Sequence, residues 1–113
     1  MTRIRSIASL TAMLSLALAG SLAAAPDQAP NAASGEKLYT AQKCSVCHAI
    51  GGKGGKMGPD LSAVGTKRDA AWLRKYLPNP KSVDPKNKMP VVKLKTPEME
   101  DLIAYLLARK GAE

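Results

Sequence analysis

Both cysteines and the single histidine of this chain lie within five consecutive residues, Cys44-Ser45-Val46-Cys47-His48. In this C-x-x-C-H pattern, two thiols three positions apart can add to the two vinyl groups of haem, and the histidine is directed at the iron. A thioredoxin-like pair needs a preceding strand, and none is visible. A zinc site needs about four ligands, and a disulfide would leave His48 unexplained. The motif therefore predicts one haem c, attached through Cys44 and Cys47 with His48 on the iron.

Three methionines are candidates for the second iron ligand. Met89 lies in a long loop before Pro90, and such a loop can cross to the other face of a haem. Met57 follows His48 closely in the chain, and Met99 falls on the apolar face of an expected helix, where core packing is the simpler role. A thioether is a soft ligand that favours reduced iron. We expect Met89 to be this ligand.

One helix is expected before the motif and another after it. The first covers residues 34–44, with Ser34 as its N-cap and Gly35 and Tyr39 on one face. The second begins after Asp69, which is a good N-cap residue, and ends before the next proline.

The third expected helix has the strongest signals. Thr96 suits the N-cap and Pro97 the first helical position, and Arg109 and Lys110 are expected in the last turn. No segment alternates convincingly as a strand, and residues 78–95 are expected to form a long loop. The apolar residues of this segment recur at the spacing of one helix face: Met99, Leu102, Ile103, Leu106 and Leu107.

Residues 1–24 have the pattern of a secretory signal peptide, with Arg3 and Arg5 before an apolar stretch and a run of small residues. An uncleaved anchor is the alternative, but so short an apolar stretch would barely span a bilayer. We expect export to the periplasm, with 25–33 as a linker or disordered tail and 34–113 as one domain. Cleavage lowers the net charge from +8 to +6, because both arginines leave with the peptide.

These motifs, in this order, resemble class I cytochromes c. The resemblance implies an all-α class I cytochrome c fold, with three main helices packed around one covalently attached haem. The short chain between the histidine and the loop methionine favours a compact bacterial type. The matching segments are Gly35 with Tyr39, Cys44 to His48, Gly58-Pro59-Asp60-Leu61, Lys88-Met89-Pro90 and residues 100–106.

The resemblance also implies residues around the haem. The carbonyl of Pro59 would accept the ring N–H of His48 and fix its orientation, although Gly58-Pro59 is also a common turn pair. Leu61 would pack on the haem ring. Trp72 is expected either to bond a haem propionate or to belong to the core, since a buried indole needs a partner in both cases.

The implied function is one-electron, outer-sphere transfer between periplasmic or membrane-bound redox proteins, without enzymatic activity or a small-molecule substrate. The alternatives are a haem-based ligand sensor or peroxidase-like enzyme with a displaceable Met89, and a cytochrome subunit of a dehydrogenase. We expect a monomer that binds acidic redox proteins and no nucleic acid. A merely solvated basic surface is the simpler interpretation of its lysines: Lys43, Lys53, Lys56, Lys81, Lys86, Lys88, Lys93 and Lys95.

Overall fold

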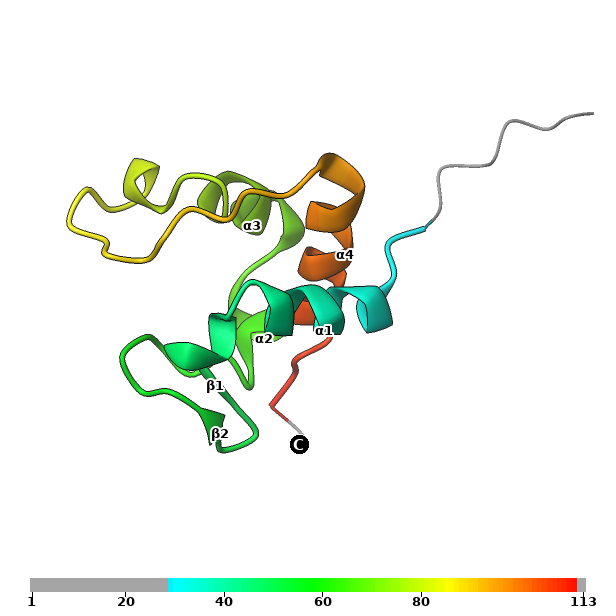
Figure 1. Ribbon diagram of the computed structural model, residues 1–113, viewed down its shortest axis with the longest axis horizontal. Coiled ribbons are helices and arrows are strands. Elements are labelled where there is room, and N and C mark those ends of the chain that lie inside the picture. The colour runs from blue at the N-terminus through cyan, green and yellow to red at the C-terminus, as the bar shows by residue number, and fades with distance from the viewer. Residues whose placement is uncertain (1–28, 112–113) are drawn as a thin grey trace, which may run out of the picture.

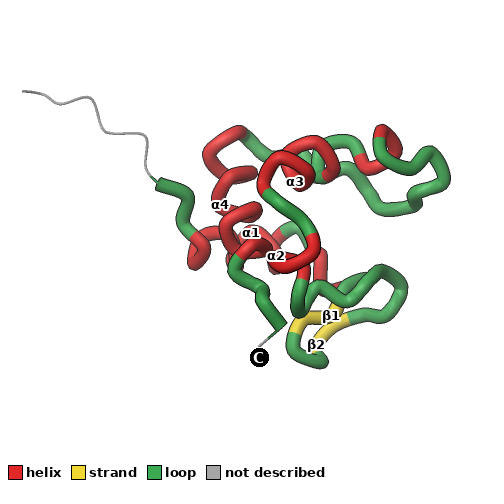
Figure 2. The backbone as a smooth tube through the Cα atoms, turned by 180° about the vertical axis from the view of Figure 1, so that it is seen from behind, coloured by secondary structure: helices red, strands yellow, loops and turns green. Residues whose placement is uncertain are grey.

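The computed structural model describes residues 29–111. The predicted signal peptide and residues 25–28 of the predicted linker lie outside these residues. The described residues contain four α-helices. The helices pack together, and a small hairpin and a long loop extend from the same side of them (Figures 1 and 2). Within the described residues, none of the helices has the length and apolar character needed to span a membrane.

Helix α1 spans Ala32–Ala41 and begins earlier than predicted. The side chain of Asn31 accepts the backbone N–H of Ser34 at 3.1 Å, so Asn31 is the N-cap. The prediction of Ser34 as the cap is therefore wrong. Asparagine caps as well as serine does, and the two alanines that follow it are strong helix formers.

Helix α4 spans Thr96–Leu107 and crosses α1. Gly35 is buried at the crossing, where an added Cβ would clash with the carbonyl oxygen of Asp101 and lie 2.7 Å from the Cβ of Tyr105. The rings of Tyr39 and Tyr105 pack beside it, with centroids 5.5 Å apart. The absence of a side chain at Gly35 therefore allows α1 and α4 to approach closely.

The ends of α4 differ slightly from the prediction. Its N-cap is Lys95 rather than Thr96, and the carboxylate of Glu98 accepts the backbone N–H of Lys95 at 3.3 Å. The helix stops before Arg109 and Lys110. Those residues instead run beside α2, which spans Val64–Lys67, with the N–H of Gly65 donating to the carbonyl of Arg109 at 2.8 Å.

Helix α3, Ala70–Tyr76, begins as predicted. The carboxylate of Asp69 caps it by accepting the backbone N–H of Trp72 at 2.8 Å. Leu73 and Leu77, which are 3% and 5% exposed, fix the helix to the core. Its outer side is joined to α4 by a forked pair, with Arg74 Nε and Nη2 at 2.6 and 2.9 Å from the Glu100 carboxylate.

Several short elements were not predicted. Strands β1 (Ala49–Ile50) and β2 (Lys53–Gly54) pair in antiparallel register, contrary to the expectation that no strand forms. Two-residue strands are too short to show the alternation that identifies a strand in sequence. Helix α2, with four residues, and the 3₁₀ turns η1 (Cys44–Val46) and η2 (Pro80–Ser82), with three each, are also short.

The core lies between α1, α3 and α4. Its most deeply buried apolar residues are Leu102 and Ile103, each 1% exposed. Met99 is buried there too, as expected for a packing residue. The remaining buried members of the cluster are Tyr39, Val64, Leu73, Leu77, Val92, Tyr105 and Leu106.

Candidate functional site

The C-x-x-C-H motif forms one tight turn directly after α1. Lys43 adopts the left-handed conformation, with φ of 59°, and reverses the chain into η1. The backbone N–H groups of Cys47 and His48 both donate to the carbonyl of Cys44, at 3.2 and 3.0 Å. Both thiols are free, and both line one cavity of about 560 Å³. Desolvation by burial raises the pKa of the Cys44 thiol.

The ring of His48 is held from two sides. Its Nδ1 lies 2.7 Å from the carbonyl oxygen of Pro59, which is the contact that the family resemblance implies. A carbonyl only accepts, so Nδ1 carries the proton and the lone pair is on Nε2. Gly58 lies against the ring, and a Cβ there would come 2.6 Å from Cε1 and 2.8 Å from Nδ1. The histidine is thus prepared to bind a metal through Nε2.

Tyr39 reaches the same turn from α1. Its hydroxyl donates to the carbonyl of His48 at 3.5 Å. Desolvation by burial, followed by the nearby Cys44, raises the pKa of Tyr39 to about 12. The hydroxyl therefore stays a proton donor throughout the neutral range.

The three candidate methionines lie in very different places. Met89 is half-buried and lines the same cavity as His48, together with its neighbours Lys88 and Pro90. Met57 is 88% exposed at the rim, whereas Met99 is buried in the core on α4. Among the three, Met89 is the one that is both sheltered and beside the histidine.

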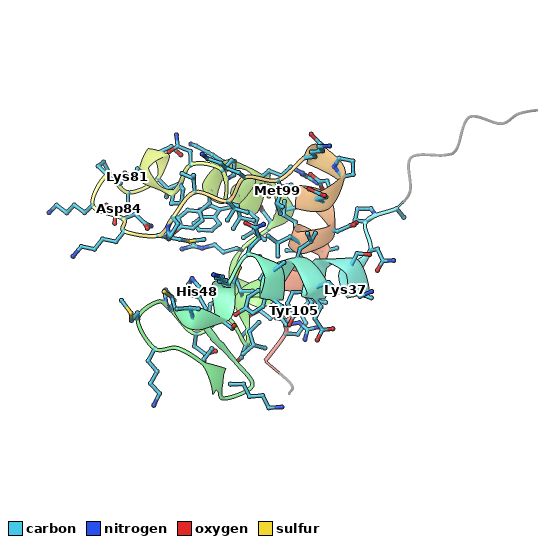
Figure 3. The ribbon with its side chains drawn as sticks, in the orientation of Figure 1. Lys37, His48, Lys81, Asp84, Met99 and Tyr105 are labelled. Carbon is cyan, nitrogen blue, oxygen red and sulfur yellow. The ribbon has the colours of Figure 1, made fainter. Side chains whose placement is uncertain are left out.

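A second cavity of about 210 Å³ continues the first. The two share Cys44, His48, Pro59 and Met89 in their walls, so they are two parts of one cleft. Figure 3 shows His48 on the same side of the molecule as Lys81 and Asp84 of the long loop, with Lys37 on the opposite side. The cleft thus opens between the motif and the loop.

The inner part of the cleft is mainly apolar and suits a flat ring. Leu61 and Trp72 both line it, as do buried core leucines of α3 and α4. The indole of Trp72 stacks on the ring of Tyr76, with centroids 4.4 Å apart and planes 15° apart. The guanidinium of Arg68 lies 4.2 Å from the indole centroid and, with Lys67, gives this end of the cleft positive charge.

Two residues at the site were missed in the sequence. Asn87 donates from Nδ2 to the hydroxyl of Tyr76 at 2.5 Å and accepts the backbone N–H of Met89 through Oδ1 at 2.7 Å. Neither Tyr76 nor Asn87 is among the residues predicted for the site. The available signal was an asparagine two residues before the loop methionine, since asparagine often bonds the backbone two residues on.

Known proteins share the sequence and the fold. The sequence profile of the cytochrome c family matches residues 32–110. The chain belongs to the cytochrome c family. The cytochrome c of Guizotia abyssinica is 38% identical over 110 residues, covering 78% of this chain and 96% of that protein. The cytochrome c2 of Rhodomicrobium vannielii is 33% identical over 99 residues, covering 68% and 78%.

A solved structure supports the all-α cytochrome fold. The chain is similar to a chain in the crystal structure of SoxXA from P. pantotrophus, with a TM-score of 0.66 at 23% identity, covering 74% of this chain and 84% of that one. Class I cytochromes c carry covalent haem c and act in electron transfer with redox partners. Haem c is therefore the cofactor of this chain, and the cleft with two free thiols and a prepared histidine fits it.

Proposed function

We propose that this protein carries single electrons through a haem c ligated by His48 and Met89. Cys44 and Cys47 form the two thioethers. The observation that carries the proposal is the shared cleft, in which His48 and Met89 face the same two cavities from segments about forty residues apart. Bound haem supplies an iron that gains and loses one electron, and the protein fixes its ligands.

The surrounding residues tune and cover this centre. The Pro59 carbonyl keeps the proton on Nδ1 of His48 and raises the ligand strength of Nε2. Leu61 and Trp72 would pack on the haem ring, and the cationic end of the cleft near Arg68 would suit the haem propionates. A thioether from Met89 raises the reduction potential.

The hydrogen bonds that hold the loop carrying Met89 favour an electron carrier over a ligand sensor or a peroxidase-like enzyme. Beyond the bond from Met89 to Asn87, the backbone N–H of Val92 donates to the carbonyl of Leu77 at 2.9 Å. A methionine between two such anchors is suited to stay on the iron, which leaves no open position for a small ligand.

The expected setting is the periplasm, after export, with the protein as a monomer. The relationship to a bacterial cytochrome c2 supports this location. Lys43 and Lys88 line the mouth of the cleft, so an acidic redox protein is the proposed partner. Electrons would pass across this mouth without contact between the iron and a substrate.

The ligand assignment is tested with Met89→Ala and its matched control Met57→Leu in the haem-loaded protein. Met89→Ala should remove the weak red-region absorption band of oxidised His/Met haem, lower the potential, and admit carbon monoxide to the reduced iron. Met57→Leu should change none of these, because Met57 is 88% exposed. The reverse pattern would refute Met89 as the ligand.

A further inference from the structure

One side-chain amide joins α3 to the backbone of Met89. Asn87 Nδ2 donates to the hydroxyl of Tyr76 at 2.5 Å, and the N–H of Met89 donates to Asn87 Oδ1 at 2.7 Å. Only the amide oxygen can accept a backbone N–H, so the bond from Met89 fixes which way the amide faces. Its nitrogen must then point to Tyr76.

Tyr76 is itself held firmly, so it can serve as an anchor. Its ring stacks on Trp72 at 4.4 Å between centroids, and the guanidinium of Arg68 lies 4.2 Å from the indole on which it stacks. Helix α3 beneath this stack is fixed to the core by Leu73 and Leu77. The Tyr76 hydroxyl, which accepts the hydrogen bond from Asn87, is therefore held in place by the packing of α3 on the core.

The loop carrying Met89 has a second attachment to the same helix end. The N–H of Val92 donates to the carbonyl of Leu77 at 2.9 Å, and Val92 is buried. Met89 lies between Asn87 and Val92, while residues 81–86 of the loop are exposed. Figure 1 shows the returning part of the loop running beside α3 toward α4. The position of the methionine backbone is thus set by α3.

We propose that Asn87 is a positioning residue for Met89, with Tyr76 as its anchor. This inference rests on the proposed function, in which Met89 binds the iron. A methionine side chain has three rotatable bonds, and an unpinned loop adds backbone freedom that ligation must remove. By fixing the Met89 N–H beforehand, Asn87 lowers this ordering cost and keeps the thioether on the iron.

The test measures how fast imidazole replaces the thioether in the oxidised, haem-loaded protein, followed through the red-region band. Asn87→Leu removes both hydrogen bonds at similar volume. Tyr76→Phe removes one bond and keeps the ring stack. Asn87→Asp keeps an acceptor for the Met89 N–H and can accept from the Tyr76 hydroxyl. Asn79→Leu is the control, since Asn79 is an exposed asparagine of the same loop.

A hydrogen bond that holds the methionine in place should slow the replacement of the thioether by a factor on the order of five. Asn87→Leu, which loses two bonds, should therefore speed replacement about thirtyfold, and Tyr76→Phe, which loses one, about fivefold. Asn87→Asp and Asn79→Leu should stay within about threefold of the wild type, since neither removes the bridge. Tyr76→Phe leaves the core packing intact, so it provides an independent result if Asn87→Leu does not fold.

Wild-type rates in both Asn87→Leu and Tyr76→Phe would overturn the inference. So would equal acceleration in Asn87→Asp and Asn87→Leu, or in Asn79→Leu and Asn87→Leu, because the effect would then be a general loosening. Met89→Ala separates the two proposals. If the band survives in that variant, the ligand assignment has failed. If Met89→Ala loses the band while the Asn87 variants match the wild type, only the positioning role has failed.

Discussion

Replacing Gly58 with alanine tests whether the orientation of His48 is built into the fold. The added Cβ would lie 2.6 Å from Cε1 of the His48 ring, 2.8 Å from Nδ1 and 3.1 Å from Nε2. Carbon atoms in ordinary contact are about 3.5–4.0 Å apart, so the ring has to retreat by about 1 Å. The hydrogen bond from Nδ1 to the carbonyl of Pro59 is only 2.7 Å long and would not keep its geometry after such a shift.

The expected cost follows from this lost bond. Leaving a histidine ligand without its supporting partner lowers its metal affinity by about 10- to 100-fold, or about 2 kcal/mol. For a domain of this size that lowers the melting temperature of the haem-loaded protein by about 10 °C. The assay is thermal unfolding followed by haem absorbance, with the oxidised spectrum recorded before heating.

Gly52→Ala is the matched control. Gly52 has φ of +78°, but an added Cβ meets nothing within 4 Å. It should lower stability by about 1 kcal/mol through backbone strain alone and leave the haem spectrum unchanged. If Gly58→Ala melts within about 2 °C of the wild type and has a wild-type spectrum, the argument that Gly58 sets the histidine ring is refuted.

Three further outcomes are expected. Gly35→Ala should destabilise the haem-loaded protein by about 3 kcal/mol in denaturant unfolding, because its Cβ meets helix backbone that cannot rotate away; a loss near zero would contradict the close crossing. Hydrogen bonding to Arg74 holds the pKa of Glu100 below its ordinary value of 4.5, so this pair stabilises the fold above that pH and loses its effect as pH falls through the lowered value. The stability difference between wild type and Glu100→Gln, from melts across a pH series, should accordingly vanish in acid, and a constant difference would count against the pair. Lys88→Glu should lower the second-order rate of electron transfer to an acidic partner far more than Lys37→Glu, and only at low salt. Equal slowing by the two variants would mean that the lysines at the cleft only keep the protein soluble.

Features marked by local chemistry were predictable from the sequence. Asp69, as an N-cap residue, predicted the start of α3, and the helical spacing of the apolar residues from Met99 onward predicted α4. The start of α1 was misplaced because Asn31 and Ser34 are both good caps, and the choice depends on Asn31 also donating its N–H to the Asp101 carboxylate at 2.8 Å, a residue seventy positions away.

The same distinction applies to the candidate site. Cys44, Cys47 and His48 follow from spacing within one turn, and their proximity in the structure needs no distant contact. The bridge from Tyr76 to Asn87 could not be read in this way. It exists because the loop folds back on α3, and that return is set by tertiary packing rather than by any local propensity.

The crossing of α1 and α4 determines when the domain can close. These are the earliest and latest helices of the described chain, and they contact each other more extensively than any other two elements. A chain made from its N-terminus exposes Cys44 and Cys47 long before Tyr105 exists to pack on Tyr39. The cavity that both thiols line has no lining residue from α4, so thioether formation does not require the last helix, whose packing on α1 completes the domain.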